Sequence, residues 1–109
     1  RLLSKYKFPP PPFLKAGALT PLASAQDMIR ECKEMNNCLD TLIKDVLAGH
    51  TYFYSWRGSE RATVMLNTIP ELGWMPTEAL GKSNKPVRSS TELEIREAVS
   101  SQIKRISSL

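Results

Sequence analysis

Apolar and polar positions alternate between residues 50 and 66, and this alternation predicts a β-hairpin around which the chain is organised. Two runs rich in β-forming residues flank Gly58-Ser59. A Gly-x pair between such runs is typical of a two-residue type II′ turn. A two-residue loop places Arg57 opposite Glu60. The pairs that follow are Trp56 with Arg61, Tyr54 with Thr63 and Phe53 with Val64.

This register gives the hairpin two different faces, because neighbouring side chains of a strand point in opposite directions. The expected core face consists of Thr51, Phe53, Ser55, Ala62, Val64 and Leu66. The expected outward face consists of Tyr52, Tyr54, Trp56, Arg61, Thr63 and Met65. Three aromatic side chains on a face that solvent touches are unusual, so the outward face is a candidate binding surface.

A helical stripe precedes the hairpin. Ser24 and Asp27 form a variant capping box that predicts a helix start at Ala25, and Gly49 supplies a stop. Asparagine is a poor helix former, so we expect a break near Asn37 and either one kinked helix or two stacked helices. The apolar positions recur at helical spacing and predict a buried face: Met28, Cys32, Met35, Leu39, Leu42 and Val46.

Residues 1–23 are predicted to form an extended, proline-rich arm. Four prolines lie between Phe8 and Phe13 and favour polyproline II. Such a run can serve as a ligand for SH3 or WW domains, but the flanking phenylalanines favour an arm that is pinned against its own domain. In that position the arm would compete with any ligand for Tyr52, Tyr54 and Trp56.

The second half of the chain predicts one more strand and one more helix. Residues 67–73 contain proline and glycine and are expected to form a loop. Trp74 to Leu80 is a predicted third strand, and Pro76 inside it indicates an edge position. After a basic loop at residues 81–88, Ser89 and Glu92 form a capping box. The helix that follows carries one apolar face: Ile95, Val99, Ile103 and Ile106.

These elements predict an α+β fold: an N-terminal proline-rich arm (1–23) and a single domain (24–109) with one kinked helix or two helices, a three-stranded antiparallel meander and a C-terminal helix. The helices are expected on one face of the sheet. The chain begins with arginine rather than methionine, so we expect it to be a fragment of a longer protein or a processed one.

Composition narrows the class of protein. The 109 residues are 41% hydrophobic and 24% charged, as in a water-soluble globular domain, and no run approaches a membrane span. Cys32 and Cys38 lie six residues apart in a helical region, which disfavours a mutual disulfide and fits a reducing, cytoplasmic compartment. A single histidine leaves a zinc site short of ligands, so we expect neither metal nor cofactor.

A pattern of short motifs resembles the PcfJ-like family over about residues 9–100. It comprises Pro21-Leu22, Met35-Asn36-Asn37-Cys38, Gly49, Tyr52-Phe53-Tyr54, Ala62-Thr63, Trp74, Glu78-Ala79-Leu80-Gly81 and Asn84. The resemblance implies a bacterial or phage protein associated with conjugative plasmids and other mobile elements, without implying a reaction. Two departures stand out: the family usually has His-Cys where this chain has Asn37-Cys38, and a glycine after glutamate where it has Glu31-Cys32.

Cys38 is the one candidate nucleophile. It lies near the predicted helix break, and a helix N-terminus lowers the pKa of a thiol. His50 is the only histidine that could act as its base, and Asp40 is either a further partner or a charge in the first helical turn. The alternative for Cys38 is a buried structural thiol, which we prefer.

Two further groups are candidates for binding. Tyr52, Tyr54 and Trp56 could stack on bases of a single strand or on a protein, with Arg57 and Arg61 beside them. Gly81 could adopt a positive φ and cradle a phosphate next to the basic residues of the 81–88 loop; the alternative is a turn closed by Asn84. Those basic residues are Lys82, Lys85 and Arg88.

The net charge is +4, and the basic residues gather toward both ends of the chain around a near-neutral middle. These basic segments are either solvated loops or contacts to an anionic partner. The first hypothesis is therefore a non-catalytic interaction module of a mobile-element or defence-related protein, binding a protein partner or nucleic acid. The second is a single-strand nucleic-acid-binding domain. A thiol-dependent enzyme built on Cys38 and His50 has the least support.

Overall fold

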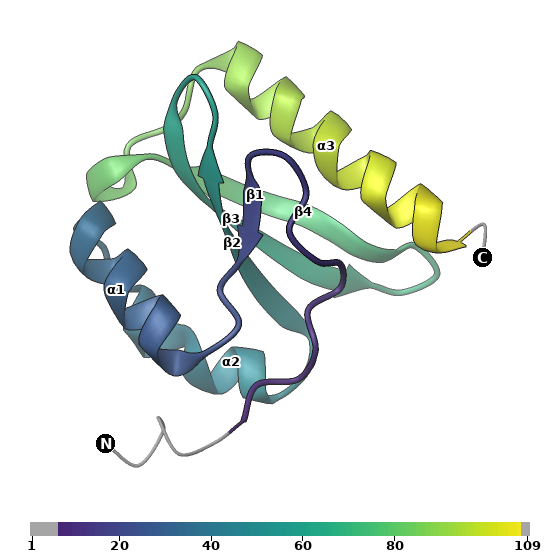
Figure 1. Ribbon diagram of the computed structural model, residues 1–109, viewed down its shortest axis with the longest axis horizontal. Helices are drawn as coiled ribbons and strands as arrows, with labels where there is room; N and C mark the ends of the chain where they lie inside the picture. Colours follow the sequence, from purple (N-terminus) through teal and green to yellow (C-terminus); the bar gives the residue numbers. More distant parts are fainter. Residues whose placement is uncertain (1–6, 108–109) are drawn as a thin grey trace.

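The structure is a computed structural model that describes residues 7–107 (Figure 1). These residues form four strands, three α-helices and two short 3₁₀-helices, which confirms the α+β class. In chain order they are β1 (Leu19–Pro21), α1 (Ala25–Met35), the 3₁₀-helix η2 (Leu39–Leu42), α2 (Ile43–Leu47), β2 (Thr51–Arg57), β3 (Arg61–Ile69), β4 (Gly73–Leu80), the 3₁₀-helix η3 (Lys82–Asn84) and α3 (Ser89–Ser107).

The sheet has four strands rather than the predicted three, in the order β1-β2-β3-β4, and all neighbours are antiparallel. The meander β2-β3-β4 is as predicted, with Pro76 on an edge strand. The additional strand β1 comes from the arm and pairs Leu19 with Trp56 and Pro21 with Tyr54. A three-residue strand ending in proline carries too short a pattern to be recognised without its partner.

The predicted register of the hairpin is wrong by one residue. Arg57 pairs with Arg61, so the loop has three residues, Gly58 to Glu60, instead of a two-residue type II′ turn. In the observed register, the aromatic side chains of β2 lie opposite apolar side chains of β3: Tyr52 opposite Leu66, Tyr54 opposite Val64 and Trp56 opposite Ala62. A register shift of one residue moves a whole strand face between core and solvent. Burial of the three aromatic side chains therefore selects the register, and this register leaves three residues in the loop.

The structure also corrects the segment after the hairpin. The predicted loop 67–73 is mostly strand, because β3 continues to Ile69 and β4 begins at Gly73. Only residues 70–72 turn, with Glu71 in a left-handed conformation (φ 69°). Helix α3 starts at Ser89, as the capping box predicts. Ile95 and Val99 are buried and Ile103 is partly buried, whereas the side chain of Ile106 lies outside the described residues.

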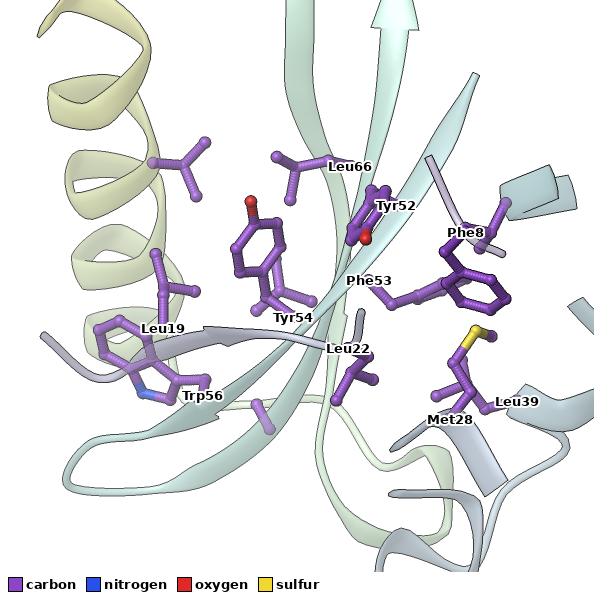
Figure 2. Close-up of a cluster of buried hydrophobic side chains, with 14 of the residues drawn as sticks. Phe8, Leu19, Leu22, Met28, Leu39, Tyr52, Phe53, Tyr54, Trp56 and Leu66 are labelled. Carbon is purple, nitrogen blue, oxygen red and sulfur yellow. The ribbon is translucent and has the colours of Figure 1, made fainter. Parts of the chain in front are cut away.

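The helices cover both faces of the sheet, not one face as predicted. α1, η2 and α2 lie on the face that carries Phe53, and α3 lies on the face that carries Tyr54 and Trp56 (Figures 1 and 2). Side chains of β2 are consequently buried in both directions: Tyr52, Phe53, Tyr54, Ser55 and Trp56.

The helical segment before the hairpin is broken where the asparagines predict a break. The Ser24 hydroxyl accepts a hydrogen bond from the Asp27 N–H (3.1 Å) and begins α1. Asn36 then adopts a left-handed conformation (φ 51°) and ends it. Four members of the predicted stripe are buried, namely Met28, Met35, Leu39 and Val46, while Cys32 and Leu42 are partly buried.

The arm is pinned against the domain, as the flanking phenylalanines predict. The Phe13 ring stacks on Tyr54 with 4.5 Å between ring centroids. The Tyr54 hydroxyl donates to the Phe13 carbonyl (2.5 Å) and accepts from the Phe13 N–H (3.0 Å). The Tyr52 hydroxyl donates to the Pro9 carbonyl (3.1 Å). Burial raises the pKa of Tyr52 to about 12 and also raises the pKa of Tyr54.

Candidate functional site

A cavity of about 370 Å³ opens between the corner that follows α1 and the strands β3 and β4. It draws its walls from three segments that are distant in sequence: residues 37–42, the middle of the sheet and residues 78–84. The lining residues are Asn37, Cys38, Leu39, Thr41, Leu42, Phe53, Thr63, Met65, Glu78, Leu80 and Asn84. This size is within the range of cavities that hold small ligands or single side chains.

Hydrogen bonds of the 36–42 corner fix one rim of the cavity. The Asn37 side-chain oxygen accepts from the Leu39 N–H (3.0 Å). The Cys38 carbonyl accepts from the N–H (3.0 Å) and the hydroxyl (2.7 Å) of Thr41. The Cys32 thiol lies 2.8 Å from the Asn37 carbonyl, to which it donates. These local bonds fix the backbone around Asn37 and Cys38 at the rim of the cavity.

The opposite rim is a tight turn around η3. Ser83 (φ 58°) and Asn84 (φ 61°) are both left-handed, a conformation that is uncommon outside glycine. Gly81 has φ −81° and not the positive φ on which the phosphate-cradle alternative depends. Its N–H instead donates to the Lys85 carbonyl (2.7 Å) and closes the turn.

The two rims are joined by one side-chain bond, from the Asn36 amide to the Ser83 hydroxyl (2.9 Å). Three left-handed non-glycine residues thus lie around one cavity: Asn36, Ser83 and Asn84. Backbone conformations of this kind cost free energy and gather at functional sites.

The interior of the cavity is apolar and its mouth is polar. Phe53, Met65 and Leu80 form part of the sheet side. Among the described residues, none is hydrogen-bonded to the Glu78 carboxylate, the Asn84 amide or the Cys38 thiol. The mouth therefore offers an acceptor, a combined donor and acceptor, and a thiol to a ligand whose apolar part enters the cavity.

A charge network, buried at Glu31 and exposed at Glu34, lies behind the wall that Thr63 contributes. The Thr63 hydroxyl donates to Glu31 (2.6 Å), whose side chain is only 3% exposed. Glu31 pairs with Arg61 through two bonds (2.5 and 3.1 Å), and Arg61 also contacts Glu34 (2.9 Å). Arg57 completes the network by a bond to Glu34 (3.1 Å).

The network shifts the pKa values of Glu34 and Arg61. Hydrogen bonds from Arg57 and Arg61 hold the pKa of Glu34 below its ordinary value. Burial lowers the pKa of Arg61, but its bonds to Glu31 and Glu34 outweigh burial and raise it. Glu31 was not among the predicted site residues. Its spacing gives a signal, because it lies three residues after Met28 and four before Met35, on the buried stripe.

The structure does not bring the candidate catalytic pair together. Cys38 is exposed, so its interpretation as a buried structural thiol is wrong. His50 is exposed, lies 3.3 Å from the Thr68 hydroxyl through Nδ1, and does not line the cavity. Asp40 lies 3.5 Å from the Cys32 thiol. Both cysteines are free, as predicted.

The predicted aromatic platform is not a surface. Tyr52, Tyr54 and Trp56 are 1%, 0% and 6% exposed and belong to the core (Figure 2). The description of this face as outward is therefore wrong, because the arm and α3 cover it.

The basic residues proposed for binding are mostly engaged with carboxylates. Arg57 and Arg61 belong to the network with Glu31 and Glu34. Arg88 contacts Glu60 through its guanidinium (3.3 Å) and its backbone N–H (3.0 Å). The two lysines of the basic loop, Lys82 and Lys85, are exposed.

Six residues of the family-like motif lie in or near the two concavities of the structure, and four of them share one cavity. Asn37, Cys38, Glu78 and Asn84 all line the cavity, although they come from segments some forty residues apart. Gly81 is buried at the start of the adjoining turn. Trp74 lies elsewhere, in a groove between β4 and α3.

Searches among protein-family models, curated proteins and solved structures find no match to this chain. Within residues 7–107 there is no group of three or more His, Cys, Asp or Glu side chains that could hold a metal ion. None of the helices described for this chain has the length and apolarity to cross a membrane.

Proposed function

We propose that this chain is a non-catalytic interaction module of a bacterial or phage mobile-element protein, and that it binds a segment of a protein partner in the cavity beside Cys38. The mobile-element context follows from the resemblance to the PcfJ-like family. The observation that carries the proposal is the convergence of Asn37, Cys38, Glu78 and Asn84 on one cavity with an apolar interior.

The chemistry of the mouth suits a peptide. An extended peptide presents N–H donors and C=O acceptors beside a side chain, and Glu78 and Asn84 match such donors and acceptors around the opening. The interior accepts an apolar side chain, which would contact Phe53 and Met65. The negative charge of Glu78 further favours a segment that carries a lysine or arginine next to that apolar residue.

The same observations weigh against single-stranded nucleic acid. Base stacking on this chain would need exposed aromatic rings, and Tyr52, Tyr54 and Trp56 are buried. Phosphate contacts would need free cations, and Arg57, Arg61 and Arg88 are paired with carboxylates. Lys82 and Lys85 are too few to give strong, salt-sensitive binding by themselves.

The proposal can be tested with peptides selected by display against the native chain. A bulky substitution at the mouth, Cys38→Trp, should weaken the selected peptides by at least about tenfold, because it obstructs the opening. The matched variant Cys38→Ser should leave affinity within about twofold, because the proposed role of this position is spatial rather than nucleophilic. Cys38 is exposed, so both variants are expected to fold.

Equal binding by the wild type and Cys38→Trp would refute the cavity as the binding site. A large loss in Cys38→Ser would instead favour the thiol-dependent alternative. Titration with a single-stranded oligonucleotide at low and raised salt examines the second hypothesis separately, and we expect no salt-sensitive binding.

A further inference from the structure

A second, larger groove of about 600 Å³ lies between α3 and the edge strand β4. Its interior includes Trp74, Pro76, Val99 and Ile103. Apolar side chains are also exposed on these two elements and the turn before β4: Leu72 is 63%, Met75 38% and Leu93 58% exposed. Exposed apolar surface beside an unpaired strand edge is typical of an interaction site.

The α3 side of this groove has a distinctive order of residues. Glu97, Ser100, Ser101 and Lys104 line it and are exposed. Spacings of three and four residues place them on one helix face, with small side chains between an acid and a base. Leu93 lies four residues before Glu97 and extends the same face. Neither Glu97 nor Lys104 forms an ion pair with another residue in the described part of the chain.

We propose that this groove binds a second copy of the same chain, with the two α3 helices packed antiparallel. A twofold axis that passes between Ser100 and Ser101 places Glu97 of each copy opposite Lys104 of the other. The contact is therefore self-complementary: one helix face supplies both partners of two equivalent ion pairs.

The residues at the crossing fit this arrangement. Serine side chains are short, so two helix backbones can approach closely at positions 100 and 101. The neighbouring helix then covers the groove and shields Trp74 and Pro76 from water. An unrelated partner would have to match the Glu-Ser-Ser-Lys order by coincidence, whereas a second copy matches it by symmetry.

Charge reversal gives a direct test by sedimentation of the full chain over a wide concentration range. The wild type should form a dimer whose population rises with concentration. Glu97→Lys or Lys104→Glu alone replaces two attractive contacts by two repulsive ones, and each should weaken the dimer by about tenfold. The double variant Glu97→Lys/Lys104→Glu restores both pairs with reversed signs and should return to within about threefold of the wild type.

A control and a cross-link complete the design. Lys44→Glu reverses the same charge at an exposed position of α2 and should leave the dimer unchanged. Ser101→Cys, made with Cys38→Ser, lies next to the axis and should give a covalent dimer under mild oxidation. A monomer at all concentrations would overturn the proposal. So would a dimer that ignores the single reversals, or one that the double variant fails to restore.

Discussion

At the scale of single residues, the wall of the cavity depends on one buried carboxylate. Glu31 is 3% exposed and accepts from both Arg61 and Thr63, whereas its neighbour Glu34 is 40% exposed at the solvent side of the same network. Removing one partner of a buried ion pair leaves an uncompensated charge. An exposed pair contributes little, because water screens it. The two glutamates provide a matched comparison.

Glu31→Gln should lower the free energy of unfolding by about 3 kcal/mol, because Arg61 loses its most buried counter-charge while the shape of the side chain is kept. Glu34→Gln should lower it by no more than about 1 kcal/mol. Urea unfolding of both variants measures the difference. Equal, small losses would show that the network is solvated and does not support the wall.

At the scale of elements, the hairpin shows what the sequence can and cannot predict. The helical stripe and both capping boxes place α1 and α3 correctly, because helix signals are local. The register of β2 and β3 depends on what covers Tyr52, Tyr54 and Trp56, and this is decided by the distant arm and by α3. Because the predicted register is wrong by one residue, Tyr52, Tyr54 and Trp56 were expected on a binding surface, whereas they belong to the core.

The cavity could be predicted only in part, because its residues are brought together by contacts between distant segments. Cys38, Glu78 and Asn84 stand out in the sequence as motif residues, but nothing local indicates that they meet. The two segments are in contact through the bond between Asn36 and Ser83, which are 47 residues apart. Glu31 was overlooked because a charged residue on an apolar stripe is ordinarily assigned to its edge.

A substitution at Gly58 tests how the hairpin loop packs against Trp56. Its φ is not among the positive ones, yet a Cβ there would approach three atoms of the buried Trp56 indole at 2.7–2.9 Å. Gly58→Ala should therefore lower the free energy of unfolding by about 1–3 kcal/mol. Ser59→Ala, in the same exposed loop, should change it by less than about 0.5 kcal/mol. Thermal or urea unfolding followed by tryptophan fluorescence measures both. An unchanged Gly58→Ala would contradict the observed packing of Trp56.

At the scale of the whole molecule, the arm is a structural part of the domain. Phe8 and Phe13 belong to the same buried cluster as Met28, Val64 and Val99, and β1 extends the sheet. The arm thereby closes the aromatic face, and the two concavities to which the proposals refer lie beside Cys38 and between α3 and β4. We therefore propose binding at these two concavities and not at the aromatic face.

Substitutions at Phe13 and Leu14 compare a buried residue of the arm with its exposed neighbour. Phe13→Ala removes a ring that is 5% exposed and stacks on Tyr54, so it should lower the free energy of unfolding by about 3–5 kcal/mol. Leu14→Ala removes a side chain that is 77% exposed and should change it by less than about 0.5 kcal/mol. If urea unfolding gives both variants the stability of the wild type, the arm is not part of the core.

We propose that the cavity beside Cys38, and not the aromatic face, binds the partner of this chain. Two-dimensional amide NMR of the full chain during titration with a display-selected peptide examines this proposal residue by residue. We expect the largest shift changes in residues 36–42 and 78–85, on the two rims of the cavity. Changes concentrated instead in Tyr52, Tyr54, Trp56 and the proline arm would contradict it.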